Sequence, residues 1–129
     1  MFVIDDDLTI HITRGDVAAF TVDAFMGEGE NKVGYNFRVG DVVRFTVCGK
    51  KDYGDVVLQK DFAVTEETAK VDIILESKDT RIGTAINKPK EYWYEIELNP
   101  ETNPQTIIGH TQDGARVFML YPEGVKEVG

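Results

Sequence analysis

Cysteine is almost absent from this chain of 129 residues, in which Cys48 is the single one. No internal disulfide can form, which excludes the small disulfide-stapled domains and favours a reducing compartment or an assembly that is not exported as a folded disulfide protein. Long apolar runs are missing too. No stretch reaches the ~18 apolar residues of a membrane span, and residues 1–7 lack the basic start and apolar region of a signal peptide. We therefore expect neither a membrane segment nor a signal peptide.

Positive charge is also scarce. The chain has 14 Lys and Arg against 23 Asp and Glu, a net charge of −9, and the acidic residues are spread along its whole length. Such a chain repels a phosphate backbone, so nucleic acid is not an expected partner. The length predicts a single domain, residues 1–129, that needs no metal or disulfide, because folding buries about two-thirds of the surface of a chain of this size.

Catalytic motifs are missing from the sequence. It contains no Gly-x-Ser-x-Gly, no His-Glu-x-x-His and no glycine loop that would bind phosphate. The two histidines, His11 and His110, fall in the polar phase of predicted strands, and Cys48 is interpreted as a structural thiol. Residues 5–7 are three aspartates that could offer oxygens to calcium, but the spacing of a calcium loop is absent. We predict no enzyme, no cofactor and no metal site.

What the sequence does contain is a strong β-strand pattern, clearest in residues 92–98, Tyr-Trp-Tyr-Glu-Ile-Glu-Leu. Trp93 and two glutamates alternate with four apolar residues, which is the period of a half-buried strand. The residues on the apolar face are Tyr92, Tyr94, Ile96 and Leu98. This segment is predicted to be a central strand with a neighbour along each edge.

Other segments alternate in the same way. The predicted strands are residues 8–13, 17–25, 42–48, 56–62, 70–76, 106–112 and 115–121, and the polar connection 27–40 has room for a short one. Within them Val56 and Leu58 are expected to point inward, whereas Cys48 falls in the outer phase. About eight strands at short spacing predict an all-β fold, an antiparallel β-sandwich with Greek-key connections.

Turn residues indicate which strands are neighbours. Arg14-Gly15-Asp16 predicts a hairpin of the first two strands, and Asp113-Gly114 predicts a hairpin of the last two. Residues 77–90 follow neither period and contain Pro89, so they are expected to form a crossover with one helical turn around residues 80–82.

The tripeptide Arg14-Gly15-Asp16 is also the one that some integrin ligands present on an exposed loop. The turn is the preferred interpretation, because a glycine is needed where the chain reverses. Arg14 and Asp16 are retained as candidate residues of an interaction surface.

Aromatic residues are the other candidates for a contact surface. They are Trp93, Tyr35, Tyr53 and Tyr121, of which Trp93 and Tyr35 are preferred. Trp93 lies among glutamates on the face opposite the apolar residues of its strand. It is covered by the second sheet or a loop, covered by a partner subunit, or left as a contact surface that could stack on a sugar, and packing in the core or under a covering loop is favoured.

Three motifs occur in a recognisable order: Leu-Thr-Ile-His-Ile-Thr-Arg-Gly-Asp at residues 8–16, Gly-Asp-Val-Val-Arg-Phe-Thr-Val at 40–47, and the aromatic strand at 92–98, followed by a glycine-containing final hairpin. Over nearly its whole length the chain resembles the small immunoglobulin-like β-sandwich of tailed-phage and prophage structural proteins, and is similar to the N-terminal domain of baseplate upper proteins. The resemblance implies a non-enzymatic virion module, located in the virion or in the bacterial cytoplasm before assembly.

Two functions follow as hypotheses. The first is a structural or assembly module that docks against copies of itself or other tail proteins, with a homo-oligomer as one outcome. The second is a carbohydrate-binding or adhesion module that uses exposed aromatic residues.

Overall fold

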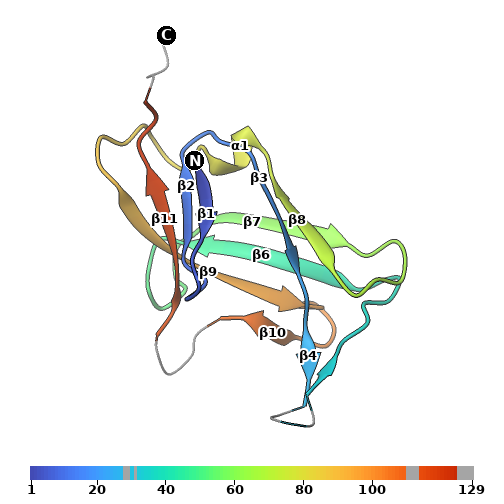
Figure 1. Cartoon of the computed structure of the whole chain (residues 1–129). Helices are drawn as coiled ribbons and strands as arrows, with labels where there is room; N and C mark the ends of the chain where they lie inside the picture. Colours follow the sequence, from blue (N-terminus) through green and yellow to red (C-terminus); the bar gives the residue numbers. More distant parts are fainter. Residues whose placement is uncertain (28–29, 31, 110–113, 125–129) are drawn as a thin grey trace.

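The computed structural model describes residues 1–27, 30, 32–109 and 114–124, and these form an all-β structure with one short helix (Figure 1). The elements are β1 (Phe2–Ile4), β2 (Ile10–Thr13), β3 (Ala18–Val22), β4 (Phe25–Met26), β5 (Val33–Gly34), β6 (Val42–Cys48), β7 (Val56–Ala63), β8 (Val71–Leu75), α1 (Ser77–Thr80), β9 (Lys90–Leu98), β10 (Gln105–Ile108) and β11 (Arg116–Tyr121). Within the described ranges, no helix has the length and apolar character that crossing a membrane requires.

The larger sheet has seven strands in the order β1-β2-β11-β9-β6-β7, with β10 also paired to β9. As predicted, β9 is central: β6 pairs along one of its edges, and β11 and β10 share the other. The ladders are antiparallel except for the one between β2 and β11, which is parallel. The prediction of purely antiparallel strands is therefore wrong at this ladder, and the sheet is mixed.

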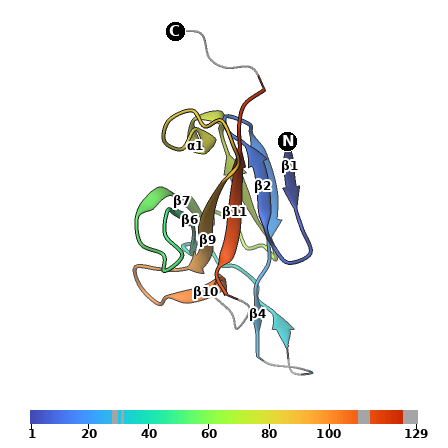
Figure 2. The same cartoon turned by 90° about the vertical axis from the view of Figure 1, so that its left-hand side faces the viewer.

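A second layer covers one face of the large sheet. It consists of β3 and β8, which pair antiparallel (Figures 1 and 2). The inward side chains of the two layers form a single core, as expected for a β-sandwich. Its fully buried members include Ile10, Ile12, Phe37, Val43, Phe45, Val47, Ile73, Leu75, Ile96, Phe118 and Leu120.

Strands β4 and β5 form a small antiparallel ladder that we call the arm. In both views it projects beyond the two sheets (Figures 1 and 2). The arm is joined to the body through Tyr35, whose backbone N–H donates to the carbonyl of Ala24 (2.8 Å), and through Phe37, which is fully buried. The polar connection 27–40 thus contains the short strand that its sequence allowed, and its aromatic residues pack back on the core.

The predicted hairpin of the first two long strands is wrong. The turn at Arg14-Gly15-Asp16 exists, with Gly15 at φ +88°, but β2 lies in the large sheet and β3 in the small one. Each strand has one apolar face, and crossing from layer to layer lets the two faces bury each other. Thr80 stabilises the crossing: its hydroxyl accepts from the Gly15 N–H (3.0 Å) and donates to the Asp16 carbonyl (2.8 Å).

Within the described residues, β10 and β11 do not pair with each other as predicted. Both β10 and β11 pair with β9, one opposite residues 96–98 and the other opposite residues 90–94. With nine residues, β9 is long enough to take both strands on the same edge. Asp113 of the predicted turn and residues 110–112 of the predicted strand lie outside the described residues.

Two residues have an exposure that differs from what their predicted strand faces suggest. Val56 is 55% exposed rather than inward, because the register shifts between Val47 and Cys48 and places an extra residue, Val57, against the core. Cys48 does lie in the outer phase but is only 1% exposed. The helical turn occurs a little earlier than expected, as α1.

Phe45 provides a test of the core. It is fully buried, and its ring centroid lies 5.7 Å from that of Tyr94 and 6.3 Å from that of Phe118. We expect Phe45→Ala to lower the free energy of unfolding by about 3–5 kcal/mol, because it leaves a cavity. Phe25→Ala, at a ring that is 53% exposed, should cost less than about 1 kcal/mol. Urea unfolding followed by circular dichroism measures both, and equal losses would contradict this account of the core.

Candidate functional site

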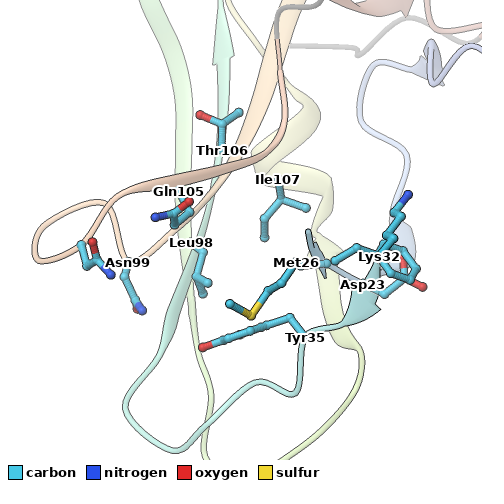
Figure 3. Close-up of a pocket in the computed structure, with 12 residues that line it drawn as sticks. Asp23, Met26, Lys32, Tyr35, Leu98, Asn99, Gln105, Thr106 and Ile107 are labelled. Carbon is cyan, nitrogen blue, oxygen red and sulfur yellow. The ribbon is translucent and has the colours of Figure 1, made fainter. Parts of the chain in front are cut away.

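A pocket of ≈ 430 Å³ lies between the arm and the turn that joins β9 to β10 (Figure 3). One wall comes from β4 and the residues just before the two strands of the arm: Asp23, Ala24, Phe25, Met26 and Lys32. The opposite wall comes from the end of β9, the turn and β10: Leu98, Asn99, Asn103, Gln105, Thr106 and Ile107. Tyr35 lies between the two walls, next to Met26 in the view (Figure 3).

The pocket is held together by the carboxylate of Asp41. Its Oδ2 accepts from the Tyr35 hydroxyl (2.7 Å) and from the Arg38 N–H (3.0 Å), and its Oδ1 accepts from the Asn99 amide (3.0 Å). The oxygen of the same amide accepts from the N–H of Val42, at the start of β6 (2.8 Å). One ionised group thereby joins the tyrosine of the pocket to the end of β9.

These contacts decide the ionisation of the group. Burial alone would raise the pKa of Asp41, but the hydrogen bonds from Arg38, Asn99 and Tyr35 outweigh it and hold the pKa below its ordinary value of 3.8. The same bond, together with burial, raises the pKa of Tyr35 above 10.0, so the hydroxyl remains a donor to Asp41. The carboxylate is an anchor at neutral pH, and the tyrosine ring is fixed by it.

Asn99 occupies a position that few residues tolerate. Its φ is +49°, in the left-handed region where asparagine is favoured over other side chains. This conformation ends β9 and starts the tight turn in which the Asn103 N–H donates to the Asn99 carbonyl (3.0 Å). The turn presents the side chains of Asn103 and Gln105 on the pocket wall.

Tyr35 was the one predicted contact residue that lies in this pocket. It is half-buried, and its ring meets that of Phe37 edge-on at 5.2 Å between centroids. Its hydroxyl is already used by Asp41. What Tyr35 contributes to the pocket is therefore ring surface.

Trp93 lies elsewhere, on the outer face of the large sheet. It is half-buried between Cys48 on β6 and Val117 on β11, so the core of the sandwich does not contain it. Its neighbour on the same face, Glu95, has a raised pKa because of burial and the proximity of Glu97. The prediction that the second sheet covers Trp93 is therefore wrong, because that sheet packs on the opposite face of β9.

Arg14 is occupied inside the fold, only 8% exposed. Its guanidinium donates to the carbonyls of Ile82 (3.2 Å) and Gly83 (2.8 Å) and pairs with Glu123 (3.0 Å). Irregular backbone after α1 needs these donors, which explains why the arginine turns inward instead of projecting from its turn. Asp16 is more exposed and pairs with the amino group of Met1.

Groups of a catalytic type are engaged with neighbours. The ring of His11 bonds through Nε2 to Asp5 (2.6 Å) and through Nδ1 to the Tyr121 hydroxyl (2.7 Å). The pKa of the Cys48 thiol is raised, first by burial and then by nearby acidic residues, which keeps it protonated. Where the structure describes the chain, no three potential metal ligands come together, and His110 lies outside the described residues.

Residues 99–105 were missed as a candidate site because they read only as a turn with two prolines. The available signal was the pair of asparagines, Asn99 and Asn103, beside those prolines. The left-handed backbone position explains why residue 99 is an asparagine. The amide of Asn103 is exposed, and the geometry of the turn does not require it.

The Asp41 anchor makes a pH-dependent prediction. Asp41→Asn should lower the free energy of unfolding at pH 7 by about 1–2 kcal/mol, because charge-assisted hydrogen bonds are lost. Since the folded-state pKa lies below 3.8, this stabilisation is present above 3.8 and disappears as the pH falls through the folded pKa. Urea unfolding of both proteins at several pH values measures the gap. A gap that stays constant into strong acid would contradict the anchor.

Arg14 makes a second prediction. Arg14→Ala leaves the carbonyls of Ile82 and Gly83 and the carboxylate of Glu123 without their donor, so we expect a loss of about 2–4 kcal/mol. Arg14→Lys should rescue only part of it, because one ammonium cannot reproduce the planar fork. Arg38→Ala, at an exposed arginine, is the matched control and should change stability by less than about 0.5 kcal/mol. A thermal unfolding series that ranks the three variants otherwise would argue against the assigned contacts.

Comparisons with known proteins identified no relative of the chain. No protein-family model, no curated protein and no solved structure matched the chain. What the chain does is therefore inferred from its own residues and from the pocket and arm that they build.

Proposed function

We propose that the chain is a non-enzymatic assembly module that acts through protein–protein contacts made by the arm. The observation that carries this proposal is the exposure of three apolar side chains on the two paired strands. Phe25 is 53% exposed, Met26 61% and Val33 65%. Single exposed apolar residues are common on proteins, but three gathered on one projecting ladder are typical of a contact surface.

The arm is built to keep these side chains in place. Met26 and Val33 are directly paired, and the ring of Phe25 has the ammonium of Lys32 4.4 Å from its centroid. A two-residue ladder is not stable by itself in water. Its attachment through the Tyr35 N–H and the buried ring of Phe37 supplies the missing support.

The composition of the arm fits a protein partner. Aromatic residues and methionine are enriched at the centres of protein interfaces, where a few large side chains contribute most of the binding energy. Phe25 and Met26 are residues of these types, and burying them against a partner removes apolar surface from water at about 25 cal/mol per Å². The surrounding acidic chain, at −9, favours solubility until such a partner is met.

The sequence resemblance defines the setting that we propose. The chain acts as part of a phage or prophage tail, as an immunoglobulin-like sandwich whose arm contacts another copy or another tail protein. The two packed sheets support this, as do the connections that cross between layers from β2 to β3 and from β8 to β9. The buried, protonated thiol of Cys48 and the engaged ring of His11 agree with a role that does not need a nucleophile.

Sedimentation velocity over a range of concentrations, with the chain alone and mixed with purified proteins encoded by neighbouring tail genes, tests the proposal. We expect a defined complex that weakens at least about ten-fold when Phe25, Met26 and Val33 are all changed to serine. The control changes Val17 and Val56, which are 64% and 55% exposed but lie outside the arm, to serine, and should leave the complex intact.

Two outcomes would reject the proposal. One is a wild-type chain that stays monomeric at all concentrations and forms no complex with any tail protein. The other is a complex that the arm variant forms as tightly as the control does. Unfolding curves of both variants establish that each is folded.

A further inference from the structure

The pocket combines two kinds of surface that are complementary to one class of small molecule. Its apolar part is formed by Tyr35, Met26, Leu98 and Ile107. Its polar part lies on the turn and at the start of β10, where the amide residues Asn99, Asn103 and Gln105 line the pocket. We propose that this pocket binds a neutral saccharide, a ligand with one apolar C–H face and a rim of hydroxyl groups.

The polar wall has hydrogen-bonding capacity that the fold does not use. Asn103 and Gln105 are exposed, and none of the side-chain hydrogen bonds that join described residues involves them. An amide offers both donors and acceptors, which is what a ring of hydroxyl groups requires. By contrast, both ends of the Asn99 amide are occupied, by Asp41 and Val42. Asn99 thus positions the wall, and Asn103 and Gln105 are free to contact a ligand.

The charges of the pocket select for a neutral ligand. Asp23 and Lys32 are the charged residues among those that line it, one of each sign. The chain as a whole carries −9, so an anionic sugar would be repelled at longer range, and the pocket offers no excess of positive charge to offset this. A cation would find a single carboxylate there. An uncharged polyol experiences neither penalty.

The size and rigidity of the pocket agree with this ligand. A volume of ≈ 430 Å³ lies within the range of about 300–1,000 Å³ that small-molecule pockets occupy. The Tyr35 ring is held by its hydroxyl bond to Asp41 and by its contact with Phe37, so little ordering is needed when a ligand arrives. Met26 of the arm belongs to the apolar part, but the amides of Asn103 and Gln105 lie on the opposite wall, so the saccharide site can be tested without changing the arm.

Titration of the full ¹⁵N-labelled chain with methyl glycosides of neutral hexoses and N-acetylhexosamines, at millimolar concentrations, tests the site by NMR. At least one probe should bind saturably and shift the amide signals of Gln105, Thr106 and Tyr35. Changing Asn103 and Gln105 together to alanine should weaken binding about ten-fold or more, because two or more hydrogen bonds are lost. Asn87→Ala, at an exposed amide outside the pocket, should have no effect.

Three results would overturn the saccharide site. They are the absence of binding by every neutral probe, binding that the double variant leaves unchanged, and tighter binding of a sialylated probe than of its neutral counterpart. Sedimentation of the double variant separates this proposal from the assembly role, since its complex formation should equal that of the wild type. An apolar peptide that binds in place of every glycoside would also reject it.

Discussion

The fold depends on one constraint, that the backbone of β9 is paired along both of its edges. Strand β6 takes one edge, and β11 and β10 divide the other. Tyr94 and Ile96 are consequently fixed against the core, where they lie 2% and 0% exposed. The site begins where this pairing ends, because Asn99 turns the chain out of the strand at φ +49° and is tied to Asp41 and Val42. Core and pocket thus share one strand.

The sequence predicted strands far better than it predicted their partners. Periodicity is local, and it correctly placed Tyr92, Tyr94, Ile96 and Leu98 of β9 inside. Pairing is non-local. A glycine turn is equally compatible with a hairpin and with a crossing between layers, so the neighbours of β2 and β3 were misassigned. The parallel ladder of β2 and β11 joins the two ends of the chain, and the bulge near Val57 depends on register, which a pattern of single residues does not encode.

The candidate site was only partly predictable for the same reason. Tyr35 could be chosen as an aromatic residue in a polar connection, and its partner Asp41 is near in sequence, but Asn99 and the amides beyond it are distant from both. Their meeting requires the pairing of β6 with β9. Arg14 shows the opposite case, in which a recognisable motif predicted exposure and the need of backbone carbonyls for donors drew the side chain inward. A motif specifies residue types, whereas burial is decided by the surrounding fold.

The arm and the pocket are physically coupled, because Phe25 and Met26 are both exposed apolar residues of the one and wall residues of the other. A protein partner that fixes these side chains changes the wall that a saccharide meets. By linkage, any factor by which the partner alters saccharide affinity is also the factor by which the saccharide alters partner affinity. A partner bound to the side of the arm that faces away from the pocket would leave the pocket open and raise the saccharide affinity by ordering the pocket wall. A partner that covers the opening of the pocket would lower the saccharide affinity. The sign of the coupling therefore reports which side of the arm a partner occupies.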